Sequence, residues 1–129
     1  MKPRDRLPEP IRQRRDFIAA RHAAHRAMPA LIVQMRARGD DAPPRVGFTA
    51  TKRIGNAVRR NRARRRLREA VRLLPQDALR DGHDYVFIAR AMTPDVPFAQ
   101  LRDQLARALR QLHADGPRHR RGRTAGSDP

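Results

Sequence analysis

The fold is decided by the stretch RVGFTATKRIGNAVRRNRARRRLREAVRLL, residues 45–74. Over residues 45–53, apolar side chains alternate with small or polar ones, which predicts a strand with one buried face. Gly55 then interrupts the pattern, and Asn56 is of a residue type that commonly caps helix N-termini. A helix is therefore expected over residues 57–74, directly after the strand.

The expected helix has one apolar face and one strongly basic face. At about 100° per residue, its apolar positions gather on a single stripe that should be buried. These positions are Ala63, Leu67, Ala70, Val71 and Leu74. The opposite face holds Asn61, Arg62, Arg65, Arg68 and Arg72, and Arg64 and Arg66 flank the stripe. Glu69 is expected to pair with Arg65 and Arg72.

The charge on this helix points to a polyanionic partner. Seven of the fifteen residues 55–69 are arginine and one is acidic. Like charges one helical turn apart repel, and Arg59 and Arg60 lie in the first turn, where the helix dipole disfavours cations. A phosphate group at this N-terminus would reverse the sign of both effects. The helix is therefore expected to bind nucleic acid.

The composition of the whole chain agrees with a small nucleic-acid-binding domain. The 129 residues carry a net charge of +17 and no cysteine. The charge is localised, because residues 45–72 sum to +10 whereas residues 73–117 sum to −1. No apolar run approaches the roughly 20 residues of a membrane span, and no signal peptide is visible. We expect a cytoplasmic protein without disulfides.

Four further elements complete the expected fold. They are a helix over residues 11–27, a strand over 30–37, a strand over 83–90 and an amphipathic helix over 96–113. Together with the first two elements they predict an α+β fold. We expect a single small two-layer domain with a mostly antiparallel four-stranded sheet and about three helices. The domain is expected to span residues 11–114, between an irregular basic arm, 1–10, and a disordered basic tail, 115–129.

The order of residues around Gly55 resembles the signature of the bacterial ribonuclease P protein component. The matching residues are Lys52, Arg53, Ile54, Gly55, Asn56, Ala57, Val58, Arg60, Asn61 and Arg62. A looser similarity extends over residues 15–112. The resemblance implies a left-handed βαβ crossover around the basic helix. It also implies a first helix that ends near Arg21 and a strand that begins by about Ala27, which differs from the helix over residues 11–27.

The resemblance further implies that the protein is not itself the catalyst. In the family, an RNA subunit holds the catalytic Mg²⁺ and cleaves precursor tRNA to release its mature 5′ end. The protein is expected to bind ribonuclease P RNA and precursor tRNA, with no catalytic residue, no metal site and no bound cofactor of its own. Neither a membrane nor a protein partner is expected.

Two groups of site residues follow from the resemblance and from the basic face. Those expected to bind RNA are Lys52, Arg53, Asn56, Arg59, Arg60, Asn61, Arg62, Arg65, Arg66, Arg68 and Arg72. Those expected in a cleft for the single-stranded 5′ leader are Phe17, Arg21, Ile32 and Gln34. Arg21 and Gln34 stand where family members often have aromatic residues, so base stacking there would give way to hydrogen bonds or charge.

The residues alone leave two other classes of function open. A nuclease acting by itself would need clustered carboxylates, or a histidine with an acidic partner. The acidic residues Asp81, Asp84, Asp95 and Asp103 are scattered, and we interpret them as turn, cap and surface residues. His22 and His25 have a spacing that could bind a metal on a helix, but without a nearby cysteine or carboxylate.

The second class is a ribosomal or nucleoid-type protein that binds nucleic acid without taking part in catalysis. The charge alone does not separate this class from a ribonuclease P protein. The ordered pattern over residues 52–62 does, because a generic basic helix would not need it.

Overall fold

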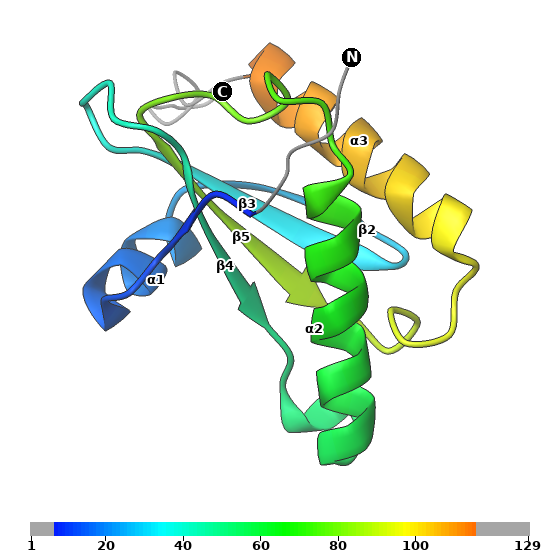
Figure 1. The fold of residues 1–129 in the computed structure, drawn as a ribbon. Coiled ribbons are helices and arrows are strands. Elements are labelled where there is room, and N and C mark those ends of the chain that lie inside the picture. Colours follow the sequence, from blue (N-terminus) through cyan, green and yellow to red (C-terminus); the bar gives the residue numbers. More distant parts are fainter. Residues whose placement is uncertain (1–6, 116–129) are drawn as a thin grey trace.

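A five-stranded sheet forms the centre of the computed structural model, which describes residues 7–115 (Figure 1). The strands are β1 (Glu9–Pro10), β2 (Ala24–Met28), β3 (Leu31–Ala37), β4 (Arg45–Thr49) and β5 (His83–Ala89), in the spatial order β1-β4-β5-β3-β2. The helices are α1 (Arg14–Arg21), α2 (Ala57–Arg72), α3 (Phe98–Asp115) and the short 3₁₀ turn η1 (Lys52–Ile54). The α+β class is confirmed, and the sheet has one more strand than expected.

The additional strand comes from the segment expected to be an irregular arm. Glu9 and Pro10 pair in parallel with Arg45 and Val46 at the edge of the sheet. Proline is compatible with this position because an edge strand leaves one side of its backbone unpaired. Residues 1–6 of the expected arm, and residues 116–129 of the expected tail, lie outside the described residues.

Antiparallel pairing predominates in the sheet, but the two strands that the basic helix connects are parallel to each other. The ladders of β3 with β2 and β5 are antiparallel, and the ladders of β4 with β5 and β1 are parallel. Helix α2 connects the parallel neighbours β4 and β5, which makes a βαβ unit. In Figure 1, β4 and β5 point downward behind α2, and β5 lies to the right of β4. This is the expected left-handed crossover, opposite to the usual hand.

The first helix is shorter than the residue pattern predicted. Helix α1 ends at Arg21, as the family resemblance implied, and the helix prediction for residues 22–27 is wrong. Residues Ala24–Met28 instead pair with Leu31–Met35 in a tight hairpin. Helix propensity is a weak preference that such strand pairing overrides. His22 and His25 therefore do not share a helix, and the spacing argument for a metal site fails.

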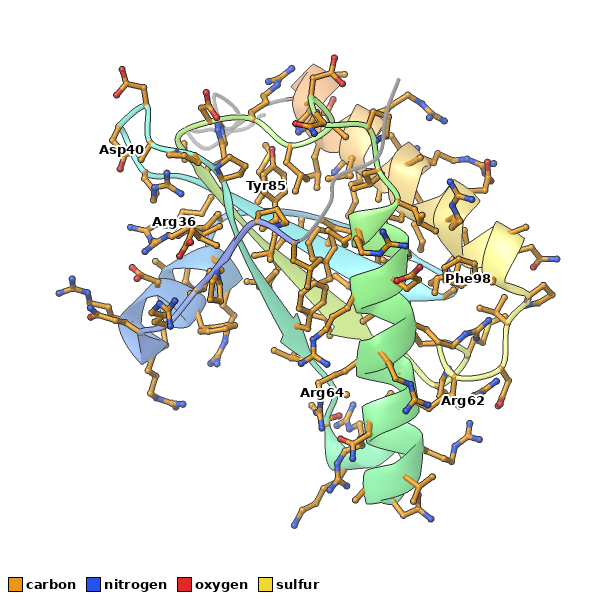
Figure 2. All side chains as sticks on the ribbon, viewed as in Figure 1. Arg36, Asp40, Arg62, Arg64, Tyr85 and Phe98 are labelled. Carbon is orange, nitrogen blue, oxygen red and sulfur yellow. The ribbon has the colours of Figure 1, made fainter. Side chains whose placement is uncertain are left out.

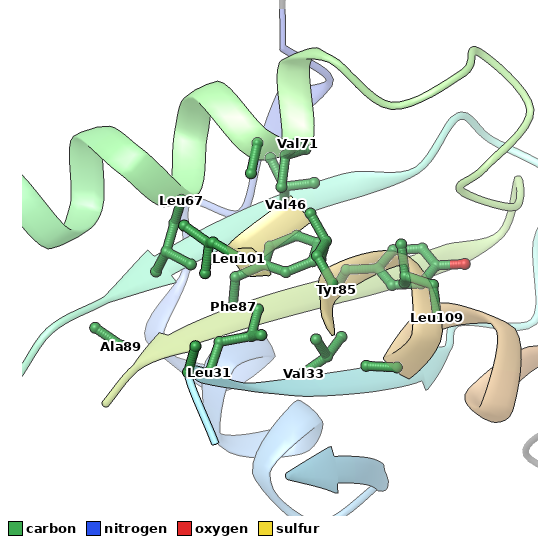
Figure 3. Packing of buried hydrophobic residues seen from close by; sticks show 14 of the residues in the cluster. Leu31, Val33, Val46, Leu67, Val71, Tyr85, Phe87, Ala89, Leu101 and Leu109 are labelled. Atoms are coloured by element: carbon green, nitrogen blue, oxygen red, sulfur yellow. The ribbon is translucent and has the colours of Figure 1, made fainter. Parts of the chain in front are cut away.

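The main core lies between the sheet and the two long helices. The predicted stripe of α2 is buried, as is the stripe of α3 that consists of Leu101, Leu105, Ala108, Leu109 and Leu112. Both helices pack on the same face of the sheet, around the stacked rings of Tyr85 and Phe87 (Figure 3). The sheet face predicted for β3, with Leu31, Val33 and Met35, is fully buried there.

Helix α1 covers part of the opposite face, so the two-layer description is incomplete. A second, smaller cluster contains Ile11, Ala20 and Val86, with Phe17 packed against it. The ring of Phe17 lies directly on Gly47, where an added Cβ would come within 2.5 Å of a ring carbon. Glycine at this position of β4 therefore allows α1 to approach the sheet closely.

An ionic network with Asp84 at its centre joins α1 to the sheet. Asp84 is fully buried and accepts hydrogen bonds from Arg36, Arg38 and Arg45 at 2.8–3.1 Å. Asp16 of α1 pairs with Arg36 at 3.0 Å and with Arg45 at 3.4 Å. Burial alone would raise the pKa of Asp84, but hydrogen bonds from Arg45 and Arg38 outweigh it and hold the pKa below its usual range. The interpretation of Asp84 as a surface or turn residue is wrong.

We predict that Asp84→Asn lowers the free energy of unfolding by about 3–5 kcal/mol, because it leaves three partly buried arginines without their shared, fully buried carboxylate. Urea unfolding followed by circular dichroism measures this loss. The control is Asp103→Asn on α3, whose exposed pair with Arg107 should contribute less than about 1 kcal/mol. Equal losses in the two variants would contradict a structural role for the network.

Candidate nucleic-acid interface

The N-terminal half of α2 projects beyond the ends of β4 and β5, together with η1 (Figure 1). Asn56 caps the helix as predicted, because its side-chain oxygen accepts a hydrogen bond of 3.0 Å from the backbone N–H of Arg59. Gly55 has a φ of 134°, a conformation that favours glycine. The cap leaves the N–H groups of Ala57 and Val58 in the first turn without an acceptor in the helix. The projecting end therefore offers backbone donors amid arginine side chains.

The outward side of α2 holds arginines that keep their guanidinium groups at the surface. Arg65 and Arg68 are exposed, and Arg68 lies over the ring of Phe48 at 5.6 Å. Arg72 pairs with Glu69 at 2.7 Å, whereas the expected second pair of Glu69 with Arg65 is not among the ion pairs of the described residues. Within residues 7–115, Arg65 is thus a surface cation that no carboxylate neutralises.

The side of α2 that faces α3 uses its arginines differently. Arg62 donates a hydrogen bond of 2.7 Å to the carbonyl oxygen of Pro94, and Arg66 donates to the carbonyl oxygens of Thr93 and Val96. In Figure 2, Arg62 leaves the helix on the side of Phe98 and Arg64 on the opposite side. These contacts hold the segment between β5 and α3, residues 90–97, against the helix. We name this segment the strap.

Arg66 is partly buried, and its guanidinium makes contacts within the protein. Its guanidinium also lies 5.9 Å from the ring centroid of Phe98. Burial, with added repulsion from Arg62, lowers the pKa of Arg66. The prediction that Arg66 binds RNA is therefore less well supported by the geometry than the predictions for Arg65 and Arg68.

Two remaining arginines of the first turn bend back over the turn that precedes the helix. Arg60 donates a hydrogen bond of 2.9 Å to the carbonyl oxygen of Gly55. Arg59 donates to the carbonyl oxygen of Ile54 at 3.3 Å and pairs with Asp95 of the strap at 2.7 Å. Hydrogen bonding to Arg59 is the largest cause that holds the pKa of Asp95 below its usual range. Asp95 is thus an exposed carboxylate within the basic surface.

Lys52 and Arg53 lie apart from the outward side of α2, on η1. With Ile32, Ile88 and Arg90, among other residues, they line a groove of about 740 Å³ at the end of the sheet. Arg90 was not predicted as a site residue, because in the sequence it follows a strand without any surrounding basic pattern. The structure therefore brings one predicted leader residue, Ile32, next to two residues predicted to bind RNA.

The other predicted leader residues lie on or beside the same face of the sheet. Phe17 and Ile88 pack against the same small cluster, and Ile88 also lines the groove. Gln34 follows Ile32 by two positions on β3, so both point to one face. Arg21 is exposed at the end of α1. The four residues thus follow one sheet face from α1 toward the groove, although Phe17 uses its ring for internal packing.

Within residues 7–115 there is no group of three or more His, Asp or Glu side chains arranged to hold a metal ion. In the same part of the chain, no helix is long and apolar enough to cross a bilayer.

Comparison with known proteins identifies the family of the chain. The family model described as Ribonuclease P matches residues 7–113. The chain belongs to the ribonuclease P protein family. The match includes the whole of α2, η1 and the strap, so the surface described above lies within the residues that the family model covers.

Relatives and solved structures of this family resemble the chain over most of its length. The ribonuclease P protein component of Caulobacter vibrioides is 53% identical over 108 residues, which cover 83% of this chain and 72% of that protein. The same component of Ruegeria pomeroyi is 50% identical, with 83% and 88% covered. Among solved structures, the RNase P protein of Thermotoga maritima has a TM-score of 0.68 at 28% identity, with 81% and 97% covered. The Staphylococcus aureus protein, at 24% identity and a TM-score of 0.69 over 81% and 94% of the two chains, shares the fold.

We predict that Arg66→Ala lowers the free energy of unfolding by about 1–3 kcal/mol, because two partly buried carbonyl groups of the strap lose their donor. Arg65→Ala is the matched control on the same helix, and its effect should stay within about 0.5 kcal/mol. Thermal and urea unfolding measure both. Equal stability of the two variants would show that Arg66 does not hold the strap.

Proposed function

We propose that this chain is the protein subunit of a bacterial ribonuclease P and that it assists removal of the 5′ leader from precursor tRNA. The observation that carries the proposal is the outward side of α2, where Arg65 and Arg68 remain exposed about two and three turns after the capped N-terminus. The family signature over residues 52–62 occupies the same projecting end of the molecule. The match to the ribonuclease P family over residues 7–113 supports this assignment over a ribosomal or nucleoid-type protein.

In this proposal the outward side of α2 docks on the ribonuclease P RNA. Arginine suits the task, because its planar guanidinium donates two parallel hydrogen bonds to a phosphate group. The N–H groups of Ala57 and Val58 add donors at the positive end of the helix dipole. Docking would neutralise charges that repel one another in the free protein, so binding relieves a cost that the isolated chain bears.

The groove beside η1 would receive the single-stranded 5′ leader. Ile32 and Ile88 supply an apolar floor on which a base can rest, while Lys52, Arg53 and Arg90 can contact the backbone phosphates. Stacking on an aromatic ring would be weaker here than in relatives that have more aromatic residues, and charge would contribute more. Leader binding by this protein should accordingly depend strongly on salt.

The chemistry of cleavage would belong to the RNA subunit, with its bound Mg²⁺. The protein would contribute by holding the precursor tRNA and by lowering electrostatic repulsion between the two RNA molecules. Both effects increase the occupancy of productive complexes when Mg²⁺ is scarce. The cytoplasm, where tRNA is made, is the compartment that this role requires.

We expect the purified protein to increase cleavage of precursor tRNA by a transcribed bacterial ribonuclease P RNA at low Mg²⁺. The measurement is the single-turnover rate with and without protein, for substrates with and without a 5′ leader. Arg65→Ala should weaken binding to the RNA by about 1–3 kcal/mol with no loss of stability. Arg102→Ala, on an exposed position of α3, is the matched control and should bind normally.

Two outcomes would contradict the proposal. The absence of any gain over the RNA alone, at every Mg²⁺ concentration, would exclude an assisting role. Cleavage by the protein without RNA would instead point to a nuclease that acts by itself.

A further inference from the structure

The strap holds a carboxylate against the first turn of α2, where a phosphate is expected in the proposed complex. Asp95 lies opposite Arg59 with both oxygens engaged: Nη2 donates to Oδ2 at 2.7 Å, and Nη1 reaches Oδ1 at 3.5 Å. The third donor of Arg59 that the structure pairs, Nε, points to the carbonyl oxygen of Ile54. The guanidinium edge that would bind a phosphate bidentately is therefore already occupied.

The strap makes two kinds of contact with α2, and they differ in how easily they can be exchanged. Arg62 and Arg66 bind backbone carbonyl oxygens, and the strap residues Thr93 and Val96 are buried. The contact of Asp95 with Arg59 is exposed, since the two side chains keep 65% and 39% of their surface accessible. An exposed ion pair of this kind is weak and open to competition by another anion.

A stronger competitor is at hand in the proposed complex. A phosphate group presents the same bidentate acceptor geometry as a carboxylate. At this position it would also lie near the N-terminus of α2, which favours anions. The carbonyl contacts of Arg62 and Arg66 would keep the strap in place while Asp95 turns away. Displacement of Asp95 therefore requires rotation of one exposed side chain and no change of fold.

We propose that Asp95 is an internal substitute for an RNA phosphate, which occupies Arg59 in the free protein and opposes docking of RNA on α2. This inference rests on the proposed function, because it assumes that RNA docks on the projecting end of α2. Asp95 would set the affinity below the maximum that the arginines allow, and it would shield Arg59 from weaker anions. Asp95 would thus limit the affinity for RNA, whereas the neighbouring arginines would increase it.

The test compares Asp95→Asn with the wild-type protein in binding to a transcribed bacterial ribonuclease P RNA. We expect about three- to tenfold tighter binding at low salt, with the gain shrinking as salt is raised. Asp103→Asn is the matched control, because it makes the same change of charge at another exposed, arginine-paired carboxylate. Its effect should stay below about twofold. Asp95→Ser, which removes the charge without introducing an amide, should behave like Asp95→Asn.

A double-mutant cycle identifies the arginine involved. Arg59→Gln should weaken RNA binding more strongly in the Asp95→Asn background than in the wild type, because in the wild type Arg59 gains the phosphate only by giving up its contact with Asp95. Equal losses in the two backgrounds would overturn the inference. So would Asp95 variants that bind like Asp103→Asn, or more weakly than the wild type. Failure of the wild-type protein itself to bind the RNA would instead contradict the proposed function.

Discussion

Repulsion among the arginines of α2 is the constraint on which the rest of the structure depends. The helix can form because one face, with Ala63 and Leu67 at its centre, is buried against the sheet and α3. Its arginines are then divided between two uses. Those beside α3 bind carbonyl oxygens of the strap, whereas Arg65 and Arg68 remain at the surface. Internal contacts thus reduce the repulsion without removing it, and the charge left over is what a polyanion can bind.

Arginines have different roles on the two faces of the sheet. On the α2 face, arginines lie outside an apolar core and stay available to solvent. On the α1 face, Arg36, Arg38 and Arg45 meet the buried carboxylate of Asp84, and Asp16 pairs with two of them, so much of their charge is matched within the fold. This network fixes α1 to β3 and β4. It therefore also fixes the sheet face that leads from Phe17 to the groove beside η1.

The elements that local sequence could predict are those whose pattern lies within one segment. The cap at Asn56, the stripe of α2 and the inward face of β3 follow from spacing alone, and the structure confirms them. The elements that were missed depend on pairing between segments. The end of α1 is set by the hairpin of β2 with β3, and strand β1 depends on a backbone partner 36 residues away. The burial of Asp84 depends on arginines 39 to 48 residues away, and the position of Asp95 on a partner 36 residues away. Hydropathy of a single segment carries no signal for such charge pairs.

The most direct test of the account locates the RNA relative to α2. The chain has no cysteine, so a single introduced cysteine can carry a tethered iron chelate that cleaves nearby RNA. Val58→Cys places the probe on the projecting end of α2, where Val58 is 75% exposed, and Gln111→Cys places it on the exposed side of α3. With ribonuclease P RNA bound, the account predicts discrete cleavage from position 58 and none from position 111. Cleavage from position 111 but not from position 58 would contradict it.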